Sequence, residues 1–170
     1  GTMSVGKTTL VNALKELEQF KGYKFATERS QHLMSLGIPL NTDSTLKGQT
    51  VFLAERCGEL MYDNIITDRT ILDVMAFTLN AKSIPHQDKD AFEVYASEFI
   101  REYDYIFYIS PHGIEIEDNG IRETDEHYRD LIDFTITTLI KRHGHKAGKI
   151  EKISGSTEER IQQILNITSL

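Results

Sequence analysis

The chain has 170 residues, of which 39% are hydrophobic and 26% charged, and its formal net charge is −7. These values are typical of one globular domain and lack the basic footprint of a general duplex-DNA binder. The single cysteine, Cys57, excludes a disulfide within the chain, and no apolar run is long enough to span a membrane. We therefore expect a cytoplasmic protein without a membrane segment, and the oligomeric state stays open.

The first eight residues, GTMSVGKT, follow the pattern G-x-x-x-x-G-K-T of a phosphate-binding loop. Two glycines allow a tight turn whose N–H groups face a phosphate, and the lysine reaches the β- and γ-phosphates of a nucleotide. The threonine that follows the lysine ligates Mg²⁺ in such loops. The sequence therefore predicts an ATP site that includes Gly1, Ser4, Val5, Gly6, Lys7, Thr8 and Thr9, with Thr8 as a Mg²⁺ ligand.

A buried strand normally precedes a loop of this kind. We expect about four to six apolar, mostly β-branched residues before Gly1 in the intact protein, the length of an ordinary short strand. The alternative is that Gly1 and Thr2 are a tag remnant in front of Met3. We favour the first explanation, because all eight positions of the pattern match.

Strand and helix patterns alternate along the rest of the chain. Short apolar runs predict strands at 23–27, 64–68, 104–110 and 149–154. Helical patterns cover 10–17, 45–62, 69–79, 91–103, 124–143 and 156–165. The helix over 45–62 is expected to bury Leu53, Cys57, Leu60 and Met61, and 84–90 is expected to be a polar connection. Thr124 is the expected N-cap of the 124–143 helix, and the last helix opens with a capping box from Ser156 to Glu159.

This alternation predicts an α/β fold with a parallel sheet, in which ligands bind beyond the carboxyl ends of the strands. Asp68 and Arg69 follow the strand at 64–68. Such a carboxylate can hold Mg²⁺ or a substrate hydroxyl, and the guanidinium can bind an anion. We predict that Asp68 is a metal ligand and catalytic residue and that Arg69 binds substrate. The alternative is an Asp68 that caps the next helix with Arg69 as its ion-pair partner.

Glu28 and Arg29 follow the strand at 23–27. A carboxylate there can act as general base toward a substrate hydroxyl, so Glu28 is a predicted catalytic and substrate-binding residue. Arg29 is a candidate for the substrate's anionic group. For both residues the alternative of an exposed surface charge stays open, as does the choice of base between Glu28 and Asp68.

Three further candidates lie on other segments. Arg122, in the long loop after the strand at 104–110, is a predicted catalytic residue that closes over the transferring phosphates. Arg129 on the following helix and Gln49 on the helix over 45–62 are predicted to bind substrate, the alternative being solvated side chains. The six histidines show no metal-ligand spacing.

Five segments carry a resemblance to a known family. They occur in the order GTMSVGKTTL, IITDRTILDVMAF, YDYIFYISP, EDNGIRETDEHYRDLID and ISGSTEERIQQIL. Together they resemble the AAA-type ATP/GTP-binding group of small P-loop kinases. That group includes nicotinamide-riboside kinase-like domains and many phage nucleoside, nucleotide and DNA-base kinases.

The resemblance implies a three-layer fold with a five-stranded parallel sheet in the order 2-3-1-4-5 and helices on both faces. The central strand would lie before Gly1, and residues 1–170 would form a single domain with a lid at about 111–125. It also implies that Lys7 and Thr8 bind ATP and Mg²⁺, that Asp68 and Arg69 face the acceptor, and that Arg122 belongs to the lid. Glu28 matches an acid of the family, whereas the family's arginine usually lies further from that acid than Arg29 does.

These observations favour a kinase that transfers the γ-phosphoryl group of ATP to a nucleoside- or nucleotide-like acceptor, with Mg²⁺. We find no guanine-specificity motif, which favours ATP as donor. Two alternatives stay open. One is a phage-type kinase of hydroxymethylated bases in DNA, and the other is an ATP-binding regulatory module with little turnover.

Overall fold

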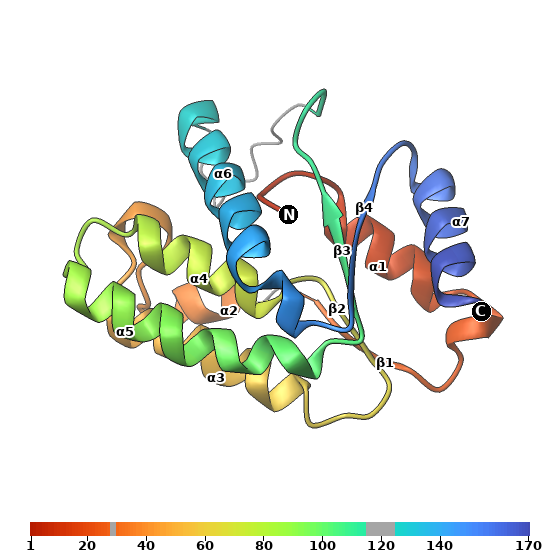
Figure 1. Ribbon diagram of the computed structural model, residues 1–170, viewed down its shortest axis with the longest axis horizontal. Helices are drawn as coiled ribbons and strands as arrows, with labels where there is room; N and C mark the ends of the chain where they lie inside the picture. The colour runs from red at the N-terminus through yellow and green to blue at the C-terminus, as the bar shows by residue number, and fades with distance from the viewer. Residues whose placement is uncertain (28–29, 115–124) are drawn as a thin grey trace.

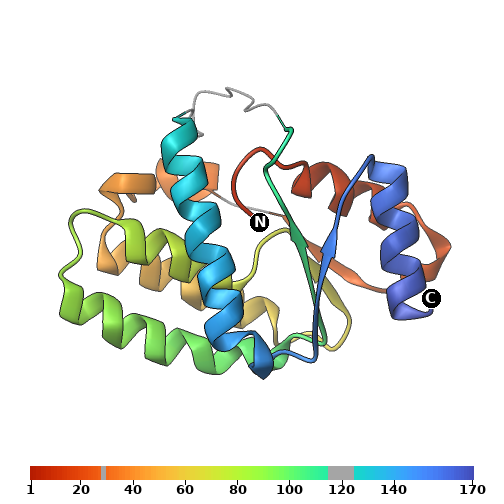
Figure 2. The same cartoon turned by 45° about the horizontal axis from the view of Figure 1, so that its top comes forward.

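The computed structural model describes residues 1–27, 30–114 and 125–170. Short parallel strands lie in the middle of the molecule, and helices cover them on both sides (Figure 1). One side carries α1 (Lys7–Lys15) and α7 (Thr157–Thr168), which pack against each other. The other side is formed by α3 (Leu46–Glu59), α4 (Ile71–Asn80), α5 (His86–Ser97) and α6 (Glu126–His143), as the turned view shows (Figure 2). The predicted arrangement of helices, strands and helices is therefore confirmed.

The strands form two parallel pairs. β1 (Lys24–Ala26) pairs with β2 (Ile65–Thr67), and β3 (Tyr105–Ile109) pairs with β4 (Lys149–Ile153). All four lie where the sequence predicts strands, and the pairs correspond to the neighbours 2-3 and 4-5 of the predicted order. The five-strand order is not confirmed, because the described residues form only these two short sheets. A central strand stays a prediction.

A cleft of about 340 Å³ lies between β2 and β3. Its walls come from both strands and from helices on both sides of the molecule, including Leu10 of α1, Ile136 of α6 and Ile164 of α7. Lys7 and Asp68 lie near the carboxyl ends of the strands, whereas Asn64 lies before the start of β2. The cleft therefore extends along the strands and is lined mainly by apolar side chains.

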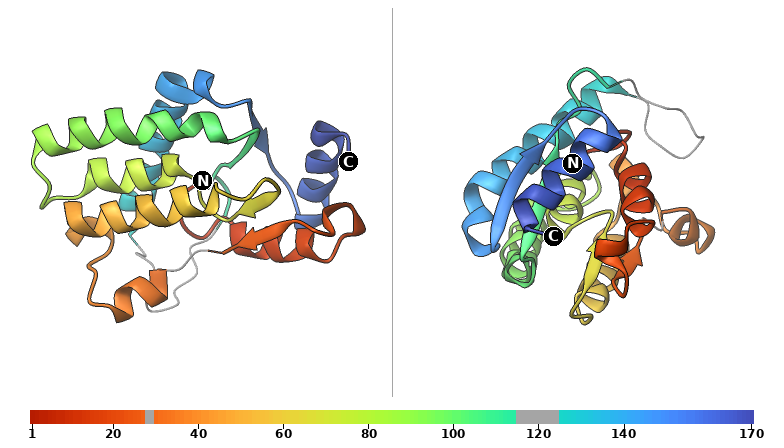
Figure 3. Two further views of the ribbon diagram at one scale, coloured as in Figure 1. Left: turned by 90° about the horizontal axis from the view of Figure 1, so that it is seen from below. Right: turned by 90° about the vertical axis from the view of Figure 1, so that its right-hand side faces the viewer.

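A further short helix, α2 (Ser30–Ser35), lies between β1 and α3 along the chain. The core on the side of α3 to α6 is centred on α4, which packs against α3, α5 and α6. Figure 3 shows these helices stacked beside the strands, with α1 and α7 opposite them. In the described part of the chain, no helix combines the length and apolarity needed to cross a membrane.

Three expectations about helix boundaries were wrong. α5 begins at His86, so most of the predicted polar connection is helical. Pro85 is the N-cap of this helix, where a residue without an N–H group removes no bond of the helix. α3 ends at Glu59, which leaves Met61 beyond the helix and 83% exposed instead of buried. The N-cap of α6 is Asp125, whose carboxylate accepts hydrogen bonds from the N–H groups of His127 and Tyr128.

Candidate functional site

The loop of residues 1–6 leads directly into α1. Gly6 has φ +78°, a left-handed conformation that a glycine adopts without strain. At Gly1 a Cβ atom would lie 2.5 Å from the carbonyl oxygen of Ile109, at the end of β3. Steric limits therefore explain why both positions of the loop pattern are glycine. Val5 anchors the loop, because its side chain is only 1% exposed.

Lys7 points back across this loop. Its Nζ donates a hydrogen bond of 2.5 Å to the carbonyl oxygen of Thr2. Thr2 is fully buried, and its hydroxyl lies 3.4 Å from the carbonyl oxygen of Arg129, at the start of α6. Lys7 therefore links the two ends of the loop through a hydrogen bond, and Thr2 fixes the loop to α6. Ser4 is 9% exposed, and Thr9 is exposed on the first turn of α1.

Thr8 and Asp68 meet at the mouth of the loop. The Thr8 hydroxyl donates a hydrogen bond to Asp68 Oδ2. The Asp68 backbone N–H donates to the carbonyl of Ala26, at a distance of 2.9 Å, and this holds the residue at the end of the β1–β2 pair. The carboxylate is 3% exposed, and its Oδ1 has no hydrogen-bond partner among the described residues. A hydroxyl and a carboxylate side by side fit Mg²⁺, which usually takes one or two protein ligands and fills its shell with water and phosphate oxygens.

Arg69 lines the cleft next to Asp68. Its guanidinium carbon lies 5.2 Å from the centre of the Phe77 ring, and its Nε is buried without a hydrogen-bond partner in the described part of the chain. The cap of α4 is Thr70, not Asp68. The alternative in which Asp68 caps that helix is therefore wrong.

Asp73 is a buried carboxylate that the sequence reasoning missed. It is 2% exposed and accepts a hydrogen bond of 2.7 Å from the Thr70 N–H. Burial by itself raises the pKa of this carboxyl, whereas Lys7, Arg69 and the Thr70 hydrogen bond lower it. The T-x-x-D spacing of a capping box was the signal that could have found it.

The other predicted substrate-binding and catalytic residues are either buried or outside the described part of the chain. Arg129 is 8% exposed and donates a hydrogen bond of 2.7 Å to the carbonyl of Ile114, so it is no solvated side chain. Gln49 is 4% exposed within α3, which also contradicts a solvated role, but it is not among the residues described as lining the cleft. Glu28, Arg29 and Arg122 lie outside the described residues, as does most of the predicted lid.

Apart from the Thr8–Asp68 pair, the described side chains offer no metal centre: no three or more His, Cys, Asp or Glu residues there lie close enough to hold an ion. The chemistry that the described residues can perform is thus concentrated where the loop meets the end of β2.

The sequence matches a family model, and the fold matches solved structures. A family model described as an AAA domain matches residues 1–160. The structure resembles deoxyadenosine kinase from M. mycoides with the products dCMP and a flexible dCDP bound, at a TM-score of 0.66 and 18% identity, covering 100% of this chain and 97% of that one. A second structure of that kinase, with bound dCTP, matches at a TM-score of 0.64 and 19% identity over the same shares. No curated protein matches the chain.

These matches define the class of protein. The fold is the α/β fold of P-loop kinases. The chain belongs to the AAA domain family whose model covers residues 1–160, as the loop and the Asp-Arg strand end had indicated.

Proposed function

We propose that the protein is an ATP-dependent nucleoside kinase, which transfers the γ-phosphoryl group of ATP to a hydroxyl of a nucleoside or of a closely related nucleotide. The observation that carries this proposal is the contact between the Thr8 hydroxyl and the Asp68 carboxylate at the mouth of a phosphate-binding loop. The fold shared with deoxyadenosine kinase supports a nucleoside as acceptor. Arg69 beside the loop adds a cation at the place where an anionic group arrives.

The loop residues bind and orient the donor. The N–H groups around Gly6 and the ammonium group of Lys7 attract the polyphosphate, and Lys7 exchanges its bond to the Thr2 carbonyl for one to a phosphate oxygen. Thr8 and Asp68 would hold Mg²⁺, which neutralises charge on the β- and γ-phosphates when bound. The loop N–H groups, the lysine and Thr8 would thus supply most of the electrostatic stabilisation of the transition state.

The acceptor hydroxyl attacks the γ-phosphorus, a new P–O bond forms, and the bond to the β-phosphate oxygen breaks to release ADP. The proton of the hydroxyl passes to a carboxylate, for which Glu28 and Asp68 are the two candidates. Arg69 and Arg129 would orient the acceptor's polar groups, Arg122 would stabilise charge on the transferring group, and Gln49 and Arg29 are further candidates for acceptor binding.

The test measures ADP formation with ATP, Mg²⁺ and a panel that contains deoxyadenosine, deoxycytidine, the ribonucleosides and the nucleoside monophosphates. We expect at least one nucleoside to accelerate ADP formation well above the rate with water. Labelled phosphate on hydroxymethylated duplex DNA alone would instead identify a DNA-base kinase. Tight ATP binding without transfer to any acceptor would indicate a regulatory module, and either result would overturn the proposal.

A further inference from the structure

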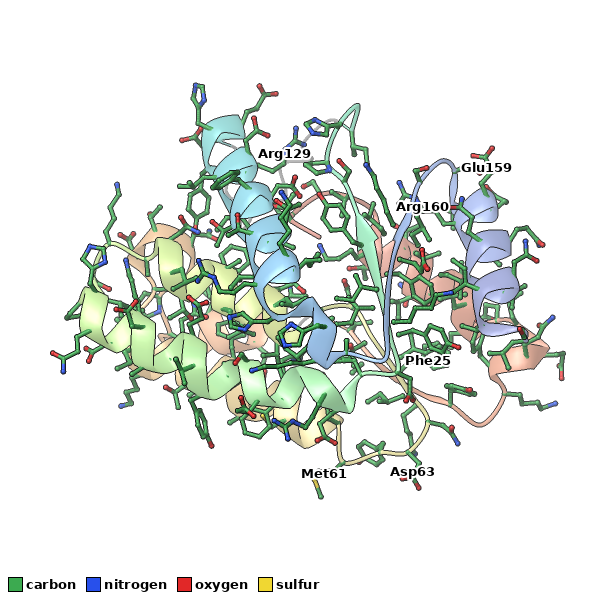
Figure 4. The ribbon with its side chains drawn as sticks, viewed as in Figure 1. Phe25, Met61, Asp63, Arg129, Glu159 and Arg160 are labelled. Carbon is green, nitrogen blue, oxygen red and sulfur yellow. The ribbon has the colours of Figure 1, made fainter. Side chains whose placement is uncertain are left out.

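Arg160 reaches the phosphate-binding loop from the opposite end of the chain. It lies on the first turn of α7, where Figure 4 shows it on the side of the helix toward the strands. Its Nη1 donates a hydrogen bond of 2.8 Å to the carbonyl oxygen of Val5 and lies 3.2 Å from the position that a Cβ on Gly6 would take. Because the residue is only 8% exposed, this contact forms largely away from solvent.

The start of α7 is fixed by a separate set of bonds. The Ser156 hydroxyl accepts from the Glu159 N–H, and the Glu159 carboxylate accepts from the Ser156 N–H at 2.7 Å, which together form a capping box. Gly155, with φ +93°, leaves room for this carboxylate, since a Cβ there would lie 2.2 Å from Glu159 Oε2. The position of Arg160 is thus set by the cap and not by the loop that it contacts.

The bond to Val5 determines which way a loop N–H group points. In a trans peptide unit the C=O and the N–H point in opposite directions. Since the Val5 carbonyl points at the Arg160 guanidinium, the Gly6 N–H of the same peptide unit points away from it. That N–H has no acceptor among the described residues. It is therefore a free donor, and the bond from Arg160 to the Val5 carbonyl fixes its direction.

A cation is also an unusual group to bury at this place. Arg160 has no ion pair with a carboxylate in the described part of the chain, and its Nε has no hydrogen-bond partner there. A buried, unpaired guanidinium is unfavourable in isolation and becomes favourable when an anion binds nearby. Arg160 bonds to the Val5 carbonyl and Lys7 to the Thr2 carbonyl, so two cations contact the loop and attract negative charge to it.

We propose that Arg160 is a positioning residue for the polyphosphate of the donor nucleotide: it holds the Val5 carbonyl so that the Gly6 N–H stays directed at a phosphate. The inference rests on the proposed ATP site but not on the identity of the acceptor. Lys7 holds the carbonyl of Thr2 only until it moves to a phosphate, whereas Arg160 holds its carbonyl before and after binding.

The experiment compares the full chain with Arg160→Gln and Arg160→Lys, and measures the Kd of ATP by calorimetry and the KM of the best nucleoside. We expect Arg160→Gln to raise the Kd of ATP about tenfold, as expected for a lost charge-assisted hydrogen bond, with the acceptor KM unchanged. Arg160→Lys, which can still donate to the Val5 carbonyl, should restore binding to within about threefold of the original value. The matched control is Arg101→Gln, an exposed arginine that pairs locally with Glu98.

A purely structural role predicts a different pattern. Arg160→Gln would then lower the melting temperature but leave the Kd of ATP unchanged, and this result would overturn the inference while the kinase proposal stood. If the unmodified protein binds ATP but phosphorylates no acceptor, the kinase proposal fails, and the Kd values of the variants still decide the role of Arg160. Failure of the unmodified protein to bind ATP would overturn both.

Discussion

The two ends of the space between β2 and β3 differ in chemistry. At the carboxyl ends of the strands lie the loop, Asp68, Arg69 and Asp73. Hydrogen bonds hold Lys7 and the two carboxylates, and the Arg69 guanidinium lies over the Phe77 ring. Further along, the same space is an apolar cleft lined by strand and helix residues such as Ile66 and Ile164. Asp63, Glu102 and Asp104 also line the cleft, before the amino ends of the strands. The first region differs because it brings Lys7 and Arg69 together with the Thr8–Asp68 pair, which suits a phosphate and Mg²⁺.

The comparison shows that most of the wall of a cleft can be apolar while the groups suited to a phosphate gather at one end of it. The apolar region can bury hydrocarbon, but it presents few polar groups that would fix the orientation of a nucleotide. We therefore expect changes at the loop end to alter activity with little effect on stability. Changes along the cleft should alter stability with little effect on the Kd of ATP.

The largest effect is expected for Lys7→Met. Loss of the only lysine in the loop should lower acceptor-dependent ADP formation by about 10³-fold, since the lysine contacts the phosphates between which the bond breaks. Lys15→Met, at the exposed end of the same helix, is the matched control and should retain full activity. More than a tenth of the original rate in Lys7→Met would place the transfer chemistry elsewhere.

Asp68→Asn should have the next largest effect. The amide keeps the size of the side chain and can still accept from the Thr8 hydroxyl, but it lacks the charge that Mg²⁺ requires. We expect a rate about 10²-fold lower and a higher Mg²⁺ concentration for half-maximal activity. The control is Asp63→Asn. Asp63, which Figure 4 labels, is exposed in the turn before β2. An unchanged Mg²⁺ dependence in Asp68→Asn would contradict a metal role for this residue.

The phosphate-binding loop could be predicted from the sequence, because its residues are close together in the chain. Gly1, Gly6, Lys7 and Thr8 occupy the fixed positions of the loop pattern. Asp68 could be predicted as well, because a carboxylate at the end of a buried strand faces the ligand side of a parallel sheet. The four strands and the polar strand ends followed from apolar runs of strand length, which are the clearest local signal in an α/β chain.

Arg160 could not be predicted, since its contact with Val5 joins residues at opposite ends of the chain and depends on how α7 packs on α1. The burial of Gln49 was missed for a similar reason. The buried face of α3 includes polar Gln49 and Arg56 as well as Leu53, so hydrophobic spacing alone placed that face incorrectly. Neither position carries a local signal that distinguishes a buried polar group from a solvated one.

The cleft gives a prediction about stability instead of activity. Extension of the chain before Gly1 by five β-branched residues should place a strand between β2 and β3, where apolar walls and two strand edges face it. Burial of these side chains, less the entropy of ordering them, should raise the free energy of unfolding by about 2 kcal/mol. Amide exchange in β2 and β3 should slow, and the Kd of ATP should hardly change.

A Gly-Ser extension of equal length is the control for this change, because it lengthens the chain without adding apolar side chains. If both extensions leave the unfolding free energy and the exchange of β2 and β3 unaltered, the cleft does not accept a strand. The prediction of a central strand before Gly1 would then be wrong.

The smallest effect is expected far from both regions, at Glu93 on α5. This residue is 8% exposed and accepts hydrogen bonds from Arg142 Nη1 at 2.5 Å and from His143 Nε2 at 2.8 Å. Burial by itself raises the pKa of its carboxyl, but the bonds from His143 and Arg142 outweigh burial and hold the pKa below the ordinary value. The carboxylate is therefore more easily ionised in the folded than in the unfolded chain.

The sign of the pH effect follows from this depressed pKa. The stabilisation is fully present above the unfolded pKa of about 4.3 and is lost as the pH falls through the lower folded value. Glu93→Gln should cost about 1 kcal/mol at pH 7, because Arg142 is partly exposed and the pair is screened. Urea unfolding of both proteins should show the difference shrinking below about pH 4. A difference that stays constant down to pH 3 would mean that Glu93 contributes through packing rather than charge. The kinase activity of Glu93→Gln should equal that of the unmodified protein.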